Sequence, residues 1–86
     1  MNYVYILRSR LTGRYYIGST NDINRRIIEH NAGKTVSLRG HVPLDIVFRK
    51  EYATLLEARR MEMRLKKKKS RVILEAIVRD QEIKGP

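Results

Sequence analysis

Two short segments near the start of the chain predict a β-hairpin, which constrains the fold more than any other feature. Residues 2–8, NYVYILR, and residues 14–20, RYYIGST, are rich in β-branched and aromatic side chains. Thr12 and Gly13 lie between them and suit a tight turn. The chain is therefore expected to begin with two adjacent antiparallel strands.

The turn also predicts which side chains of the hairpin share a face. A turn centred on Thr12-Gly13 pairs Tyr5 with Thr20 and Leu7 with Gly18. Because successive side chains of a strand point to opposite faces, Tyr5 and Tyr16 then lie on the same side of the sheet. The same alternation gives the list Tyr3, Tyr5, Leu7, Tyr16 and Gly18 for that face.

The middle of the chain predicts a short helix, a loop and a third strand. Asn21 or Asp22 can cap a helix that runs to about Ala32, where Gly33 provides a left-handed stop. Its isoleucines, Ile23, Ile27 and Ile28, are expected to face the core. Residues 33–44 read as a basic loop, and residues 45–52, DIVFRKEY, as a strand.

Two further helices are predicted in the last third of the chain. Thr54 and Glu57 have the spacing of a capping box, and apolar residues recur at helical spacing to about Lys69. Ser70 can cap the last helix. Its apolar stripe consists of Ile73, Leu74, Ile77 and Val78, and residues 80–86 are expected to fray as a tail. The predicted order of elements is ββαβαα.

Length and composition indicate one domain and an anionic partner. A chain of 86 residues can form a single compact core, expected over residues 2–79, so residues 1–86 are treated as one domain. The absence of cysteine fits a reducing cytoplasm. A net charge of +10 favours a nucleic acid over a membrane surface, because the basic segment is not paired with a face rich in Trp and Phe that could insert. No stretch approaches the roughly 18 apolar residues that span a bilayer. Such charge can also serve solubility alone or a role on the ribosome.

Glu62 is a candidate ligand for a cation. By helical angle it lies between Leu55 and Ala58, inside the apolar stripe, where an unpaired carboxylate is costly to bury. One divalent ion, Mg²⁺ with waters and a substrate phosphate, would neutralise it. A salt bridge to Arg59 or Lys66 would do so equally well.

Arg26 and His30 form a second candidate group. They are four residues apart and are expected at the rim of the core. A guanidinium can clamp phosphate oxygens, and an imidazole can transfer a proton near neutral pH. Tyr5 and Tyr16 could add phenols on the sheet, although all four residues could also serve packing alone.

Basic residues are concentrated towards the end of the second predicted helix. Eight of the nineteen fall between Arg59 and Arg71. Cations at a helix C-terminus complement its dipole, but this effect does not require so many. We therefore predict a track for a phosphate backbone, without base-specific readout, formed by Lys34, Arg39, His41, Lys66, Lys67, Lys68 and Lys69.

These residues together resemble the GIY-YIG nuclease superfamily. YVY at Tyr3 to Tyr5 is followed after ten residues by YIG at Tyr16 to Gly18, and then by Arg26, His30 and Glu62 at similar spacings. The segments STNDINRRIIEHNAGK and LEARRMEMRLKK also resemble the small, single-domain bacterial branch of that superfamily. The similarity extends from Tyr3 to about Arg71. That bacterial branch is related to the nuclease domain of an excision-repair endonuclease.

The resemblance implies an α+β fold, with a three-stranded antiparallel sheet flanked by helices, and hydrolysis of DNA phosphodiesters. Tyr5 and Tyr16 match the tyrosines of the two motifs, Arg26 the arginine that stabilises the phosphate, and His30 the histidine one turn later. Glu62 matches the sole protein ligand of one Mg²⁺ or Mn²⁺ ion. The sequence departs from the pattern at two places. Tyr3 stands where the motif name has glycine, and no asparagine follows the helix that contains Glu62, so Ser70 or solvent would have to serve in its place or that function is absent.

The resemblance implies an endonuclease of DNA repair or processing. A protein partner could direct the enzyme, expected to be a monomer, to its substrate. Two other functions are compatible with the sequence. One is a non-catalytic basic module that binds nucleic acid, and the other is a small adaptor that docks on a repair or ribosomal protein.

Overall fold

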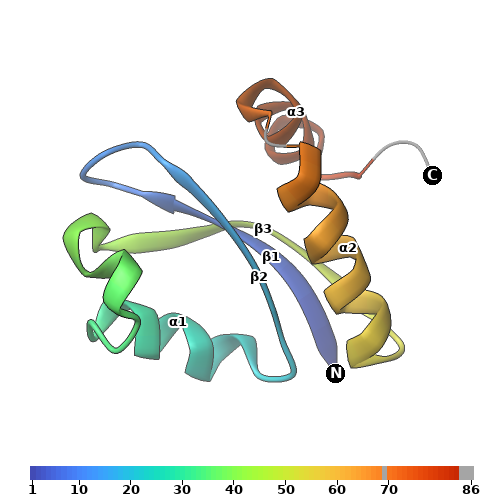
Figure 1. Ribbon diagram of the computed structural model, residues 1–86, viewed down its shortest axis with the longest axis horizontal. Coiled ribbons are helices and arrows are strands. Elements are labelled where there is room, and N and C mark those ends of the chain that lie inside the picture. The colour runs from blue at the N-terminus through green and yellow to red at the C-terminus, as the bar shows by residue number, and fades with distance from the viewer. Residues whose placement is uncertain (69, 84–86) are drawn as a thin grey trace.

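The computed structural model describes residues 1–68 and 70–83, and shows one antiparallel sheet with helices on both faces (Figure 1). Strand β1 lies in the centre, so the order across the sheet is β2-β1-β3. The elements in chain order are β1 (Asn2–Ser9), β2 (Tyr15–Thr20), α1 (Ile23–Asn31), η1 (Val36–His41), β3 (Leu44–Tyr52), α2 (Leu55–Lys68) and α3 (Arg71–Asp80). The predicted fold class and element order are confirmed. The addition is η1, a 3₁₀ helix inside the segment predicted as a loop.

The hairpin register differs from the prediction by two residues. Tyr5 pairs with Gly18 and Leu7 with Tyr16. The predicted pairing of Tyr5 with Thr20 was wrong, because the turn begins earlier: the hydroxyl of Ser9 accepts hydrogen bonds from the amides of Leu11 and Thr12. A shift of two residues leaves every side chain on its face, so Tyr5 and Tyr16 share one side of the sheet as predicted.

The sheet divides the apolar interior into two clusters. On one face Val4, Ile6 and Phe48 pack against α2 and α3. On the other face Tyr5 and Leu7 pack against α1 and η1, in a cluster of buried residues completed by Ile23, Leu38 and Leu44. Figure 1 shows α1 and η1 on one side of the sheet and α2 and α3 on the other. The interior therefore consists of two thin apolar clusters, one on each face of the sheet, and not of the single core expected from chain length.

Helix α1 begins and ends where the sequence predicted, but one of its isoleucines faces the solvent. The Asp22 carboxylate caps the helix by accepting from the amide of Arg25 at 3.1 Å, and Gly33 follows with a φ of +79°. Ile28 is 68% exposed, contrary to the prediction. The inward positions, spaced by four and three residues, are instead Ile23, Ile27 and His30.

The second half of the chain follows the predicted caps and stays packed beyond the predicted core. Thr54 accepts from the amide of Glu57 at 3.2 Å, and Ser70 accepts from the amide of Ile73 at 3.3 Å. Gln81 donates to the carbonyl of Val47, and Ile83 packs against the cluster under α2 and α3. The predicted tail is thus packed as far as residue 83, and its residues 84–86 lie outside the described residues.

Ile73 was predicted in the inward stripe of α3, but its side chain is 36% exposed.

Within residues 1–68 and 70–83 no helix has the length and apolar character needed to cross a membrane.

Candidate functional site

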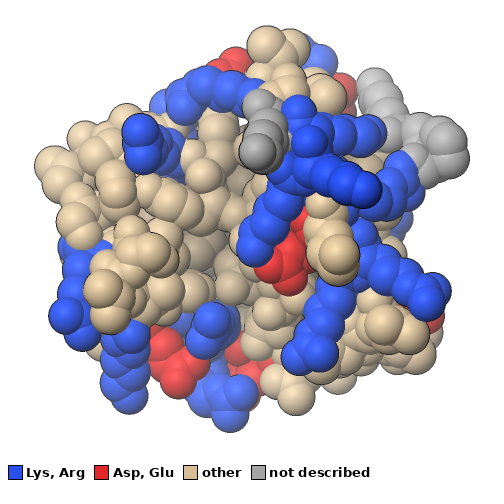
Figure 2. Space-filling model, viewed as in Figure 1, with Lys and Arg blue, Asp and Glu red and all other residues tan. Residues whose placement is uncertain are grey.

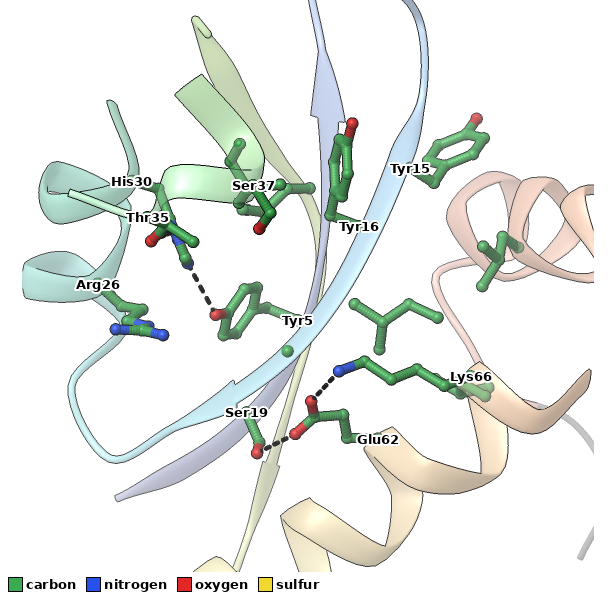
Figure 3. Close-up of a pocket in the computed structure, with 16 residues that line it drawn as sticks. Tyr5, Tyr15, Tyr16, Ser19, Arg26, His30, Thr35, Ser37, Glu62 and Lys66 are labelled. Carbon is green, nitrogen blue, oxygen red and sulfur yellow. Dashed lines mark hydrogen bonds and ion pairs between the residues drawn. The ribbon is translucent and has the colours of Figure 1, made fainter. Parts of the chain in front are cut away.

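A cavity of about 470 Å³ opens along the edge strand β2. Its walls come from α1 and η1 on one side and from α2 and α3 on the other. Five residues singled out in the sequence all line it: Tyr5, Tyr16, Arg26, His30 and Glu62 (Figure 3). They reach it from opposite faces of the sheet, because α1 and α2 cover different faces and meet only across β2.

Gly18 allows the two halves of this site to meet. It lies opposite Tyr5 in the strand register. A Cβ at this position would overlap the hydroxyl and ring of Tyr5, with the ring carbon Cε1 only 2.9 Å away. The Tyr5 ring therefore occupies the space that a side chain at position 18 would fill, which explains glycine in the YIG motif.

Tyr5, His30 and Thr35 form a buried hydrogen-bonded chain. The Tyr5 hydroxyl lies 3.1 Å from Nε2 of His30, and Nδ1 of His30 lies 2.7 Å from the hydroxyl of Thr35. Tyr5 and His30 are each only 4% exposed. The prediction that His30 lies at the rim was therefore wrong, since it occupies the inward face of α1. Both ring nitrogens have a partner, so the imidazole is held in one orientation.

Burial and the charge of Arg26 set the protonation of this chain. Burial lowers the pKa of His30, and the neighbouring Arg26 guanidinium lowers it further. Burial also raises the pKa of Tyr5, while Arg26 acts in the opposite direction. At neutral pH the imidazole is accordingly uncharged and the phenol protonated. Arg26 itself is 44% exposed and lies 3.8 Å from the Glu29 carboxylate.

Glu62 is held from two sides at the other wall of the cavity. The hydroxyl of Ser19 donates a short hydrogen bond to its Oε1, and the Lys66 ammonium lies 2.6 Å from Oε2. The Glu62 side chain is 19% exposed. Of the two basic residues that the sequence offered as salt-bridge partners, Arg59 and Lys66, Lys66 is the one paired with Glu62. Figure 3 shows the carboxylate between these two side chains, across β2 from Tyr5.

Tyr16 lines the cavity differently from Tyr5. Its hydroxyl is buried and has no hydrogen-bond partner among the described residues, and its ring packs 5.4 Å from the ring of His41. In Figure 3 the hydroxyls of the two tyrosines point in different directions. Only Tyr5 is therefore placed to exchange a proton with His30.

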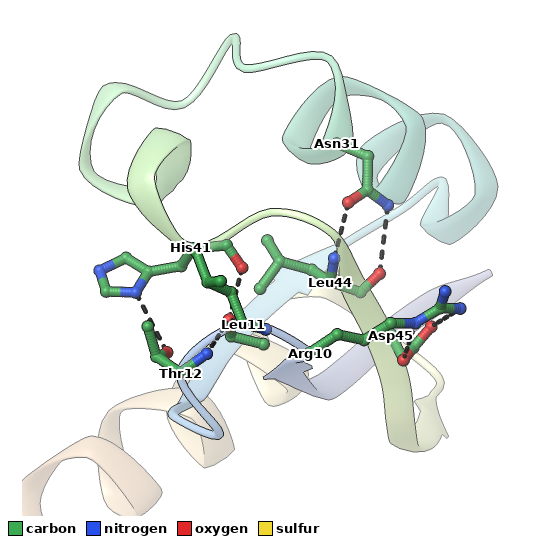
Figure 4. Close-up of polar contacts among 8 residues, drawn as sticks. Arg10, Leu11, Thr12, Asn31, His41, Leu44 and Asp45 are labelled. Atoms are coloured by element: carbon green, nitrogen blue, oxygen red, sulfur yellow. Dashed lines mark hydrogen bonds and ion pairs between the residues drawn. The ribbon is translucent and has the colours of Figure 1, made fainter.

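Polar contacts between the hairpin turn and the end of η1 hold His41 in place (Figure 4). The Ser9 hydroxyl donates to the carbonyl of His41, and the Thr12 hydroxyl lies 3.2 Å from Nδ1 of its ring. Nearby, the Asn31 amide both donates to and accepts from the backbone of Leu44. His41, which the sequence assigned to the phosphate track, is thus engaged in packing against the hairpin.

The predicted basic track is divided by the structure. Lys34 and Arg39 are exposed beside α1, where Arg39 donates to the carbonyl of Gly33, and neither lines the cavity. Lys66 is at the cavity wall, whereas Lys68 borders a separate groove between α2 and α3. Lys67 is exposed, and Lys69 lies outside the described residues. Figure 2 shows Lys and Arg side chains gathered over α2 and again over α1, with a hollowed uncharged surface between them.

Four polar residues that line the cavity were not assigned to the site from the sequence: Tyr15, Ser19, Thr35 and Ser37. Strand alternation could have found Ser19, because it places that side chain on the face that α2 covers. Thr35 lies in the segment predicted as a loop, and no sequence pattern indicated its contact with His30.

The donor atoms around Glu62 suit a hard divalent ion. Mg²⁺ is commonly bound through one or two carboxylates, with waters and substrate phosphates completing the shell. Glu62 and the Ser19 hydroxyl offer oxygen donors at an open cavity, and the Lys66 ammonium now occupies a position beside the carboxylate that suits a cation. No cluster of three or more His, Cys, Asp or Glu side chains that could enclose a metal exists in the described part of the chain. The residues therefore fit an ion shared with a substrate.

Ser70 does not take part in this arrangement. Its hydroxyl caps α3, and it lines a neighbouring cavity rather than the one that contains Glu62.

Comparison with known proteins agrees with this geometry. The profile described as the GIY-YIG catalytic domain matches residues 1–74. A UPF0213 protein from Streptococcus pneumoniae is 40% identical over 68 residues, which are 78% of this chain and 68% of that protein. A UPF0213 protein from Halobacterium salinarum is 37% identical over 67 residues, covering 77% and 86% of the two chains. The solution NMR structure of a UPF0213 protein from Bacillus halodurans is 39% identical, with a TM-score of 0.55 over 91% of this chain and 83% of that one.

Proposed function

The chain belongs to the GIY-YIG family, a family of nuclease type, and from this premise we propose that it is an endonuclease that hydrolyses DNA phosphodiesters with one divalent ion, Mg²⁺ or Mn²⁺. One observation carries the proposal: a guanidinium, a phenol bonded to a neutral imidazole, and a carboxylate converge on one cavity along β2. This combination matches the needs of phosphodiester hydrolysis, namely charge stabilisation, a proton acceptor and a ligand for a cation. DNA repair or processing is the proposed setting.

Glu62 would hold the divalent ion, with Ser19 fixing the orientation of its carboxylate. A divalent ion held there would supply positive charge to stabilise the phosphate and the departing oxygen. Lys66 must release Oε2 for this ligand position to open, and its ammonium is then free to pair with a substrate phosphate.

Arg26 would stabilise the phosphorane-like transition state. It lines the cavity on the same wall as His30, and nearly half of its side chain is open to a substrate. Its planar guanidinium can donate two parallel hydrogen bonds to non-bridging oxygens, on which negative charge grows as water adds.

Tyr5 and His30 would carry the proton away from the attacking water. The tautomer of His30 with its proton on Nδ1 donates to Thr35 and leaves Nε2 to accept from the Tyr5 hydroxyl. Water would pass its proton to the Tyr5 oxygen while Tyr5 passes its own proton to Nε2. The lowered pKa of His30 keeps this acceptor neutral at pH 7 before the reaction.

The test is cleavage of a panel of labelled duplex, branched and single-stranded DNA in Mg²⁺ or Mn²⁺. We expect wild-type cleavage, with Glu62→Gln and Arg26→Ala reduced by at least about a hundredfold because each removes a group that acts on transition-state charge. Glu51→Gln, at an exposed carboxylate of β3, is the matched control and should retain activity. Equal cleavage by wild type and Glu62→Gln would assign the activity to a contaminant.

The alternative is a non-catalytic module that binds nucleic acid. The ion pair between Glu62 and Lys66 favours it, because this pair neutralises the carboxylate without a metal. Salt-dependent DNA binding with no metal-dependent cleavage would support this function in place of the first. Neutralising Lys66 to Lys69 is expected to weaken binding on all sequences alike in either case.

A further inference from the structure

A second cavity adjoins the first at the end of the hairpin. It measures about 690 Å³ and is lined by Arg14, Tyr15, Tyr16, Ser70, Arg71 and Leu74. Tyr15, Tyr16 and Leu74 are shared with the cavity that contains Tyr5 and Glu62. A nucleic-acid strand that passes through the first cavity can therefore continue directly into the second.

Two arginine side chains, Arg14 and Arg71, line this second cavity, and Arg8 lies beside them in the wall of a separate cavity. The guanidinium of Arg71 lies 5.0 Å from the centre of the Tyr15 ring, and that of Arg8 lies 5.8 Å from the same centre. Their Nη2 atoms also approach one point beside the hairpin turn, at 4.0 Å and 3.8 Å from where a Cβ on Gly13 would lie. Arg14 lines the cavity from the hairpin turn, one residue before β2 begins. Stacking on Tyr15 holds two of these guanidinium groups in place.

Positive charge exceeds negative charge at this position. Arg71 is paired with Glu75 at 2.8 Å, but both side chains are about half exposed. Arg8 and Arg14 form no ion pair with any residue in the described ranges. Three guanidinium groups facing one carboxylate repel one another, and an anion placed among them removes that repulsion.

We propose that Arg8, Arg14 and Arg71 form a binding site for the backbone phosphate that neighbours the phosphate being cleaved, on the same nucleic-acid strand. This inference rests on the proposed function, since it assumes that a strand occupies the first cavity. The guanidinium fork matches phosphate oxygens and carries no base specificity. The site thus selects a substrate with consecutive phosphodiesters and positions the strand relative to Glu62 and Tyr5.

Equilibrium binding in EDTA tests the site without requiring cleavage. The probe is a fluorescently labelled single-stranded DNA 12-mer, and anisotropy is measured across a series of salt concentrations. We compare wild type with Arg14→Gln/Arg71→Gln. The matched control is Lys50→Gln/Arg79→Gln, which removes the same charge from exposed residues of β3 and the end of α3. Thermal unfolding of each variant shows that it is folded.

We expect the double arginine variant to bind about tenfold more weakly, as for loss of a hydrogen bond to a charged group. The slope of log affinity against log salt should fall by about 0.7 for each phosphate of the single strand that the variant no longer neutralises. The control should keep the wild-type slope. Equal slopes for wild type and the arginine variant would overturn the site.

Two further measurements separate the possible ligands and the two proposals. If the arginine variant loses affinity only for a 12-mer that carries a terminal phosphate, the ligand is a chain end and the backbone assignment is wrong. If wild type binds with the arginine-dependent slope but cuts nothing in Mg²⁺ or Mn²⁺, the binding site stands and the nuclease proposal fails. If Arg14→Gln/Arg71→Gln cuts and binds as wild type does, the nuclease proposal stands and the proposed phosphate-binding site is wrong.

Discussion

Replacing Gly18 by alanine should displace Tyr5 and so disturb both stability and the candidate site. The added methyl group would overlap the hydroxyl and two ring carbons of Tyr5, which is 4% exposed and cannot swing into solvent without leaving its cluster. Overpacking of this kind costs about 1–3 kcal/mol. In a domain of this size that cost corresponds to a decrease in Tm of roughly 5–20 °C.

Thermal or urea unfolding of Gly18→Ala measures this cost directly. Gly40→Ala is the matched control, because a Cβ at position 40 meets no atom within 4 Å, and neither glycine has a φ in the left-handed region. The control should be neutral or slightly stabilising, since alanine restricts the unfolded chain.

A double-mutant cycle identifies the Tyr5 ring as the cause. Tyr5→Leu removes the ring atoms that the methyl group would overlap, so adding Gly18→Ala to that variant should cost at least about 1 kcal/mol less than in the wild type. If Gly18→Ala were as stable as Gly40→Ala, the close packing of Tyr5 over β2 would be refuted, and with it the explanation for glycine in the motif.

Three more predictions concern the hydrogen-bonded chain and the carboxylate. Thr35→Val should lower the free energy of unfolding by about 1–3 kcal/mol in urea titrations, because it leaves Nδ1 of buried His30 unpaired, whereas Thr35→Ser should restore it. The free energy of unfolding should also decrease in acid, because the pKa of His30 is lower in the folded state than in the unfolded state. The stabilisation by neutral His30 is complete above its unfolded pKa of about 6.5 and is lost as pH falls through its folded pKa. Urea titrations of His30→Gln should show a smaller decline between pH 7.5 and pH 5, and an equal decline would contradict the assignment. Lys66→Met should raise the affinity for Mn²⁺, measured by calorimetry without DNA, because the ammonium no longer competes for Oε2 of Glu62; unchanged affinity would exclude Glu62 as the ligand.

Local signals determined most of the secondary structure. Residue type and spacing alone predicted Thr54 and Ser70 as helix caps and limited the first cap to Asn21 or Asp22. Thr54, Ser70 and Asp22 each make the expected bond to a backbone amide. Alternation along the strands placed Tyr5 and Tyr16 on one face even though the register was misjudged, because the error was an even number of residues. Periodicity within an element depends only on the residues of that element.

Contacts between elements followed from the tertiary structure alone. The sequence grouped Tyr5, Arg26, His30 and Glu62 by resemblance, but only the fold shows that they approach from opposite faces and meet across the edge of β2 at Gly18. Thr35 as a partner of His30, and Ser19 as a partner of Glu62, were likewise decided by distances between segments. The pair of Glu62 with Lys66, four residues on in the same helix, was one that helical spacing already offered. Distances between segments depend on how helices and strands pack, and neither residue type nor helical spacing fixes them.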